Sequence, residues 1–89
     1  MWGWDEPKRQ ANLSKHGLDF AALGDIDLSV LQIDPDLRQD YGEPRYAVYF
    51  ERNGRLHQII FTPRNGRFRL ISFRKANKRE QRKWASRNL

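Results

Sequence analysis

The chain has 89 residues, of which 38% are hydrophobic and 31% charged, and it contains no cysteine. This length allows one domain, residues 1–89, and excludes a large enclosed substrate cavity, while the missing cysteine excludes disulfides and thiolate metal sites. The net charge of +6 is uneven, because residues 1–63 hold seven basic and ten acidic side chains whereas residues 64–89 hold ten basic and one acidic.

Two short helices are predicted at the start of the chain. Asp5 is a suitable N-cap for a helix whose first turn contains Glu6 and Pro7, and Gly17 is suited to end that helix in a left-handed conformation. Asp19 is the expected N-cap of a second short helix that buries the apolar side chains following it.

The rest of the fold is predicted to be an antiparallel sheet and a C-terminal helix. Residues 28–33 alternate weakly and indicate a strand, and a polar loop follows up to Pro44. Three further β-rich runs, residues 45–52, 55–64 and 67–75, are joined by the Asn-Gly pairs that type I′ hairpins favour. Asn77 then caps a helix in which Glu80 stands at N3 and Trp84 is the one large apolar side chain.

The two-residue turns fix the register of the three long strands, so the faces of the sheet can be assigned. Residue 52 lies opposite 55 and residue 64 opposite 67, which pairs Phe50 with His57 and Thr62 with Arg69. The predicted core face carries Tyr46, Val48, Phe50, Ile59, Phe61, Phe68 and Leu70, with Ser72 and Arg74 near its end. The predicted open face carries Thr62, Arg64, Arg67 and Arg69, with Tyr49, Gln58, Ile60, Ile71 and Phe73 behind them.

Few side chains offer conventional catalytic chemistry. Most Asp residues fall between positions 19 and 40, where caps and turns explain them, so no metal site and no cofactor are predicted. His16 lies at a predicted helix C-terminus and His57 on the core face of a strand, and a structural role is favoured for both.

Arginine is the residue type that the predicted register gathers on one face of the sheet. Arg64, Arg67 and Arg69 share one face, where like charges repel unless an anion or a carboxylate lies among them. The guanidinium group matches phosphate, so the predicted partner is a polyanion, which leaves DNA, RNA or an acidic protein segment open. The basic side chains of the last helix are explained equally well as a solvated surface.

RNA offers one further chemistry. Its 2′-hydroxyl attacks the adjacent phosphate without a metal if a protein supplies a general base, cations for the pentacoordinate phosphate and an acid for the leaving oxygen. Arginine and lysine suit the second role. The residue types present do not identify which side chain is the general base.

Two separated motifs resemble the BrnT family of toxins from bacterial type II toxin–antitoxin pairs. The first is Trp4-Asp5-Glu6-Pro7-Lys8-Arg9-Gln10-Ala11-Asn12-Leu13-Ser14-Lys15-His16-Gly17-Leu18-Asp19-Phe20. The second is Ile71-Ser72-Phe73-Arg74-Lys75-Ala76-Asn77-Lys78-Arg79-Glu80. The resemblance implies a RelE-like α+β fold with two N-terminal helices, an antiparallel sheet and a C-terminal helix. It also implies a ribonuclease that arrests translation and is neutralised by a BrnA-type antitoxin, which itself binds the operator DNA.

We therefore expect a metal-independent endoribonuclease toxin. The expected catalytic residues are Arg64, Arg69, Arg74 and Lys75, with Glu80 or His16 in proton transfer. The expected RNA-backbone contacts are Arg67, Lys78, Arg79 and Arg82. The competing hypothesis is a non-catalytic basic module that binds nucleic acid or an acidic partner, and the arginine face is alternatively an antitoxin-docking surface.

The expected location is the cytoplasm. The opening residues 1–6 lack the basic and apolar stretches of a signal peptide, and no apolar run has the length of a membrane span. We therefore expect no contact with a membrane.

Overall fold

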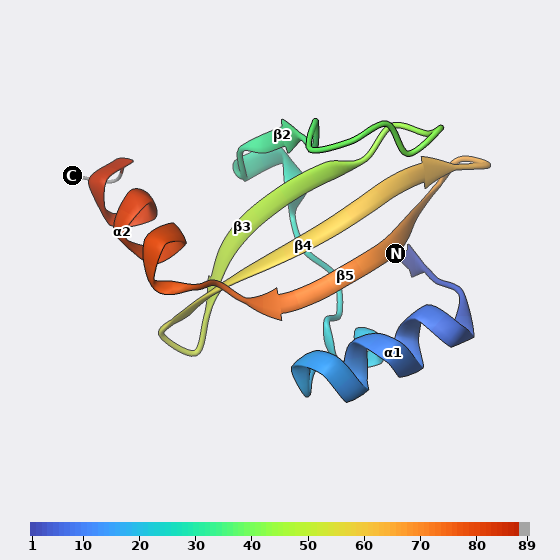
Figure 1. The fold of residues 1–89 in the computed structure, drawn as a ribbon, viewed down its shortest axis with the longest axis horizontal. Coiled ribbons are helices and arrows are strands. Elements are labelled where there is room, and N and C mark those ends of the chain that lie inside the picture. Colours follow the sequence, from blue (N-terminus) through green and yellow to red (C-terminus); the bar gives the residue numbers. More distant parts are fainter. Residues whose placement is uncertain (88–89) are drawn as a thin grey trace.

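The computed structural model describes residues 1–87, so the last two residues of the predicted domain lie outside the described part. Figure 1 shows a strongly twisted sheet with one helix along its side and another at its end. The elements in chain order are β1 (Trp2–Gly3), α1 (Glu6–His16), two 3₁₀ turns (Phe20–Ala22 and Leu28–Val30), β2 (Ile33–Pro35), β3 (Tyr46–Arg52), β4 (Arg55–Arg64), β5 (Arg67–Lys75) and α2 (Lys78–Arg87).

The sheet has five strands in the order β1-β5-β4-β3-β2. Strand β1 runs parallel to β5, pairing Trp2 with Phe68 and Gly3 with Arg69, and the other neighbours are antiparallel. The prediction of a purely antiparallel sheet was therefore wrong at this edge. The two residues of β1 are too short a run to show strand periodicity in the sequence.

The prediction of two N-terminal helices was also wrong. Helix α1 forms as predicted and ends at Gly17, whose φ is +70°. The Asp19 side chain accepts a hydrogen bond from the Ala21 N–H at 2.9 Å, but the segment that it caps is a single 3₁₀ turn, Phe20–Ala22. Burial of Phe20 and Leu23 against the sheet anchors this turn without a longer helix.

The strand predicted at residues 28–33 begins only at its last residue, Ile33. Residues Leu28–Val30 form a 3₁₀ turn instead, because the Asp27 carboxylate accepts hydrogen bonds from the backbone N–H and the hydroxyl of Ser29. A side-chain oxygen that binds the backbone locally competes with strand formation. The alternation of apolar residues in this segment reflects packing of Leu28 and Leu31 against the core.

The two hairpins and their turn registers are confirmed. Strands β3 and β4 pair Phe50 with His57, and β4 and β5 pair Thr62 with Arg69. Asn53 and Asn65 have φ angles of 54° and 53°, and the glycine that follows each also has a positive φ. These are the conformations that a type I′ turn requires.

A β-bulge in β5 changes the predicted faces. Leu70 pairs with Phe61, whereas Ser72 pairs with Ile60, so Ile71 is the extra residue of β5. The bulge places Phe73 in the core, where it is 3% exposed, and turns Arg74 to the opposite face beside Gln58. The predictions of Phe73 on the open face and of Ser72 and Arg74 along the core face were therefore wrong.

The core lies between one face of the sheet and the segment of residues 18–31. Its buried side chains are Phe20, Leu23, Val48, Phe50, Ile59, Phe61, Leu70 and Phe73. The predicted core members of β3, β4 and β5 are confirmed, with Tyr46 and Phe68 packed at the margin.

Helix α1 is attached to β5 through Asn12, a buried residue. The Asn12 amide nitrogen donates to the Phe73 carbonyl at 2.8 Å, and the Asn12 amide oxygen accepts from the Phe73 N–H at 3.0 Å. The same amide nitrogen donates to the Leu18 carbonyl at 3.0 Å. Asn12 thus replaces a neighbouring strand at the edge of β5 and holds α1 there. Figure 1 shows α1 alongside β5.

Candidate functional site

The predicted site residues do not form one cluster. Arg69 and Arg74 are five residues apart on β5, which corresponds to about 17 Å along an extended strand. The two guanidinium groups also bind different carboxylates, Asp5 for Arg69 and Glu80 for Arg74. Successive side chains of a strand point to opposite faces, so Lys75 also lies on the other side of the sheet from Arg74.

The first group lies at the β4–β5 turn. Arg64, Arg67 and Arg69 line a shallow hollow of about 300 Å³ together with Gly3, Trp4 and Asn65. Arg64 forms an ion pair with Glu43 at 3.1 Å, and Arg69 forms one with Asp5. The repulsion expected among these arginines is therefore relieved partly by the chain's own carboxylates. Arg67 has no ion pair within residues 1–87.

Asp5 differs from its prediction. Its backbone is extended, as an N-cap residue requires, but its side chain makes no capping hydrogen bond to α1. The carboxylate instead binds Arg69 of β5, because β1 brings the start of α1 next to that strand.

The second group surrounds Arg74 and Glu80. The Arg74 guanidinium donates two hydrogen bonds, each of 2.8 Å, to the two carboxylate oxygens of Glu80. The Tyr49 hydroxyl donates to Glu80 at 2.7 Å and accepts from the Gln58 amide at 3.0 Å. Asn77 and Glu80 also cap α2 reciprocally, as predicted. This network fixes the position of Arg74 on the sheet.

Glu80 is suited to hold Arg74 rather than to exchange protons. Hydrogen bonds from Arg74, together with those from Asn77 and Tyr49, lower the pKa of Glu80 to about 2 against the cost of its burial. The pKa of Arg74 is raised by the same contact with Glu80. A carboxylate with so low a pKa is a weak base at neutral pH.

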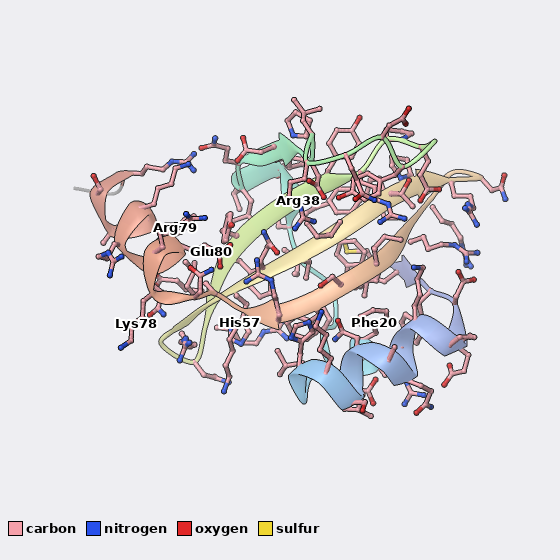
Figure 2. All side chains as sticks on the ribbon, viewed as in Figure 1. Phe20, Arg38, His57, Lys78, Arg79 and Glu80 are labelled. Carbon is pink, nitrogen blue, oxygen red and sulfur yellow. The ribbon has the colours of Figure 1, made fainter. Side chains whose placement is uncertain are left out.

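Arg38 adds a cation to this face that the sequence did not predict. It donates two hydrogen bonds of 2.8 Å to Asp36, whose pKa is lowered to about 2 mainly by this contact. The Tyr41 hydroxyl also donates to Asp36 at 3.1 Å. Figure 2 shows Arg38 in front of the sheet, and its charge lowers the pKa of Arg74.

A groove of about 260 Å³ lies between α1 and β5 at the bulge. Its polar side chains come from α1 (Lys8, Asn12, Lys15 and His16) and from β5 (Ser72), and Ala11 and Ile71 complete its lining. Lys8 and Lys15 were not among the predicted site residues. Their spacing of seven residues, two turns of helix, was the signal that they share one face.

His16 is the one imidazole in this groove. Burial lowers the pKa of His16, and the positive charges of Lys15 and Arg74 lower it further. The lowered pKa favours the neutral ring, which carries a lone pair that can accept a proton. The positive charge of Arg74 therefore reaches the His16 ring in the groove.

The remaining predicted cations are distributed around these groups. Lys78, Arg79 and Arg82 are exposed on α2, and Figure 2 shows the first two beside Glu80 at the start of that helix. Lys75 lines a separate pocket with His57. Within residues 1–87, no three His, Asp or Glu side chains are grouped to hold a metal ion.

Comparisons with known proteins identify the family of the chain. A family model described as "Ribonuclease toxin, BrnT, of type II toxin-antitoxin system" matches residues 4–80. The chain belongs to the BrnT family. The resemblance inferred from its two motifs is thereby confirmed, and with it a ribonuclease toxin of a type II system, which implies an RNA substrate and an antitoxin partner.

A solved structure supports the same family membership. The chain is 37% identical to the BrnT ribonuclease toxin of Brucella abortus, with a TM-score of 0.69 over 88% of this chain and 99% of that one. No match was found among curated protein sequences. Within the part of the chain that is described, neither helix has the length and apolar character of a membrane span.

Proposed function

We propose that this BrnT-family protein is a metal-independent endoribonuclease that cuts RNA in the groove between α1 and β5. The observation that carries the proposal is an imidazole, His16, that shares this groove with the cations Lys8 and Lys15 and feels the charge of Arg74 nearby. This combination supplies a base and a positively charged site for phosphate, two of the three requirements for cleavage without a metal.

The proposed reaction is attack of a ribose 2′-hydroxyl on the adjacent phosphorus. His16 accepts the hydroxyl proton as the new O–P bond forms, while Lys8, Lys15 and Arg74 stabilise the negative charge on the phosphoryl oxygens. The bond to the 5′ oxygen of the next nucleotide then breaks, and an ammonium group of the groove donates the proton that this oxygen takes up. The products are a 2′,3′-cyclic phosphate and a 5′-hydroxyl end.

The other cations fit a path for the RNA backbone. Arg67, in the hollow at the β4–β5 turn, is four residues along β5 from Ile71 of the groove, about 13 Å, so it would contact a phosphate other than the one at the cleaved bond. Lys78, Arg79 and Arg82 of α2 would contact the strand beyond Arg74. Each such contact adds to a salt-dependent affinity.

The biological setting follows from the family. We propose that cleavage of messenger RNA in the cytoplasm arrests translation and that a BrnA-type antitoxin neutralises the protein and carries it to operator DNA. The order of helix, sheet and basic C-terminal helix supports the proposed kinship with RelE-like ribonucleases.

Cleavage of a short single-stranded RNA by the purified protein in EDTA tests the reaction. The expected fragments carry 2′,3′-cyclic or 3′-phosphate ends and 5′-hydroxyl ends, detected by mass spectrometry. Arg74→Ala is expected to lower the rate by at least tenfold while remaining folded by circular dichroism, and Lys83→Ala, an exposed change on α2, serves as the charge-matched control. Cleavage that appears only on addition of Mg²⁺ contradicts the proposal. Salt-sensitive RNA binding with no cleavage would favour the non-catalytic basic module.

A further inference from the structure

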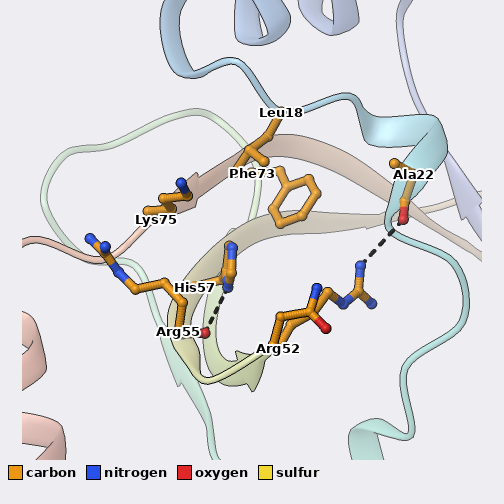
Figure 3. Close-up of a pocket in the computed structure, with 8 residues that line it drawn as sticks. Leu18, Ala22, Arg52, Arg55, His57, Phe73 and Lys75 are labelled. Carbon is orange, nitrogen blue, oxygen red and sulfur yellow. Dashed lines mark hydrogen bonds between the residues drawn. The ribbon is translucent and has the colours of Figure 1, made fainter.

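A pocket of about 530 Å³ lies on the core side of the sheet, next to the β3–β4 turn. Figure 3 shows its lining, in which apolar and aromatic groups alternate with cations. The apolar part comes from Leu18, Ala22 and Phe73, the cations are Arg52, Arg55 and Lys75, and His57 and Asn53 complete it. The volume is in the range of small-molecule pockets.

The cations of this pocket are held by neutral acceptors. Arg52 donates to the backbone carbonyls of Ala22 and Leu23 at 3.3 and 2.5 Å, and Arg55 donates to the Ala76 carbonyl at 3.1 Å. No carboxylate is among the lining residues, so these positive charges are not neutralised inside the pocket. Such a rim attracts an anion, and arginine in particular matches phosphate.

His57 gives the pocket a directed polar group. The residue is only 6% exposed, and its ring stacks on Phe50 with a centroid distance of 5.7 Å. Its Nδ1 lies 2.9 Å from the Arg55 carbonyl, which accepts a hydrogen bond from Nδ1–H. The other ring nitrogen, Nε2, makes no hydrogen bond within residues 1–87.

The free nitrogen opens onto the pocket. Among residues 1–87, every solvent-inaccessible side-chain nitrogen or oxygen has a hydrogen-bond partner, so Nε2 is not sealed inside the core. A buried ring that lines a cavity and has one unpaired nitrogen there is suited to form a hydrogen bond with a ligand.

We propose that this pocket binds one nucleobase of the RNA, with a donor of the base edge on His57 Nε2 and the attached phosphate on the cationic rim. The inference rests on the proposed ribonuclease function and adds a subsite for sequence preference. A base has apolar faces for Phe73 and Leu18 and amino or imino donors at its edge. Lys75, predicted as catalytic, serves this subsite.

The position of the pocket fits one RNA strand that occupies both sites. The groove between α1 and β5 and the pocket are separated by Asn12, which binds the backbone of both Phe73 and Leu18. Ser72 lines the groove and Phe73 lines the pocket, so consecutive residues of β5 face the two sites. A nucleotide near the cleaved bond can therefore reach the pocket around the C-terminal end of α1.

An acidic peptide fits this pocket less well than a nucleotide. A carboxylate would suit the cationic rim, but it has no flat apolar face to place against Phe73 and Leu18. An apolar side chain would leave His57 Nε2 unpaired. The observations therefore favour a nucleobase over an antitoxin segment as the occupant.

The binding test uses the intact protein and ligands that cannot be cleaved. The four nucleoside 3′-monophosphates and inorganic phosphate are titrated by isothermal calorimetry and by NMR chemical-shift mapping. We expect at least one nucleotide to bind tenfold or more tightly than phosphate, with shifts centred on His57 and Phe73. Equal affinity for all five ligands would overturn the proposal.

Two variants separate the parts of the subsite. His57→Phe keeps the ring and removes Nε2, and it should reduce the preference among the four nucleotides by about tenfold. Lys75→Ala, an exposed change that leaves the core intact, should weaken all four nucleotides by a similar factor of about three to ten, whereas Lys83→Ala should weaken none. Unchanged nucleotide affinity in both pocket variants would overturn the proposal.

Cleavage-site mapping on an RNA pool separates this inference from the proposed reaction. His57→Phe should still cut RNA while its distribution of cleavage sites becomes less selective than that of the unsubstituted protein. An unchanged distribution contradicts the subsite even if the groove is the catalytic centre. If both variants still bind nucleotides but no longer bind the purified antitoxin, the pocket is a protein-docking site and the proposal is wrong.

Discussion

Asn12→Ala should destabilise the fold more than any other single change on α1. The Asn12 side chain is 6% exposed and satisfies the N–H and the carbonyl of Phe73 as well as the Leu18 carbonyl. Alanine leaves the two Phe73 groups buried without partners, at about 1–3 kcal/mol each. We therefore expect a loss of about 2–6 kcal/mol, a large fraction of the ~5–15 kcal/mol typical of a small domain.

Urea unfolding followed by circular dichroism measures this loss. The matched control is Gln10→Ala, which removes an exposed amide of the same helix whose one hydrogen bond is to Glu6 at 3.0 Å. The control should change the free energy of unfolding by less than about 0.5 kcal/mol. A loss below about 1 kcal/mol in Asn12→Ala would refute the assignment of Asn12 as the substitute for a strand at the edge of β5.

Three further outcomes follow from the contacts described above. The pKa values of Glu80 and Asp36 are lowered to about 2, so the stability from these carboxylates is present above about pH 4.5 and lost toward pH 2. Urea unfolding across this range should show the free energy of unfolding decline. In Glu80→Gln this decline should be smaller. Gly17→Ala should lower stability by about 1 kcal/mol, measured by thermal unfolding, because Gly17 has a φ of +70°; no loss would contradict the left-handed C-cap. Arg67→Ala should reduce the salt dependence of RNA binding more than Arg64→Ala does, since Glu43 already neutralises Arg64, and equal slopes would contradict this ranking.

The parts of the fold that follow local rules were predictable from the sequence. The two Asn-Gly pairs specify type I′ turns, and these turns fix the register of three strands to the residue. The stop of α1 at Gly17 and the reciprocal cap of Asn77 and Glu80 likewise depend on neighbouring residues alone.

The parts that depend on distant contacts were not predictable in this way. The bulge at Ile71 leaves no mark in a sequence of alternating residues, yet it exchanges the faces of Phe73 and Arg74. Strand β1 exists only because β5 offers it an edge, and that pairing draws Asp5 away from its capping role to Arg69.

For the candidate site, the residue types were predicted from the sequence better than their arrangement in space. Arginine was identified as the converging group, and the structure separates these arginines along β5. His16 lines the groove, but Lys8 and Lys15 beside it belong to a helix whose orientation toward β5 is set by Asn12. Nothing in the sequence indicated that contact, so the lysines were not assigned.

The most direct test of the central claim is the single-turnover rate of RNA cleavage in EDTA for His16→Ala, measured across pH 5 to 8. The unsubstituted protein should gain rate as pH rises through the lowered pKa of His16, because the neutral ring is the active form. His16→Ala should lose at least a hundredfold in rate and lose this pH dependence, while its RNA affinity stays within a few fold. A variant that cuts RNA at a similar rate with the same pH profile would contradict the assignment of the groove as the catalytic centre.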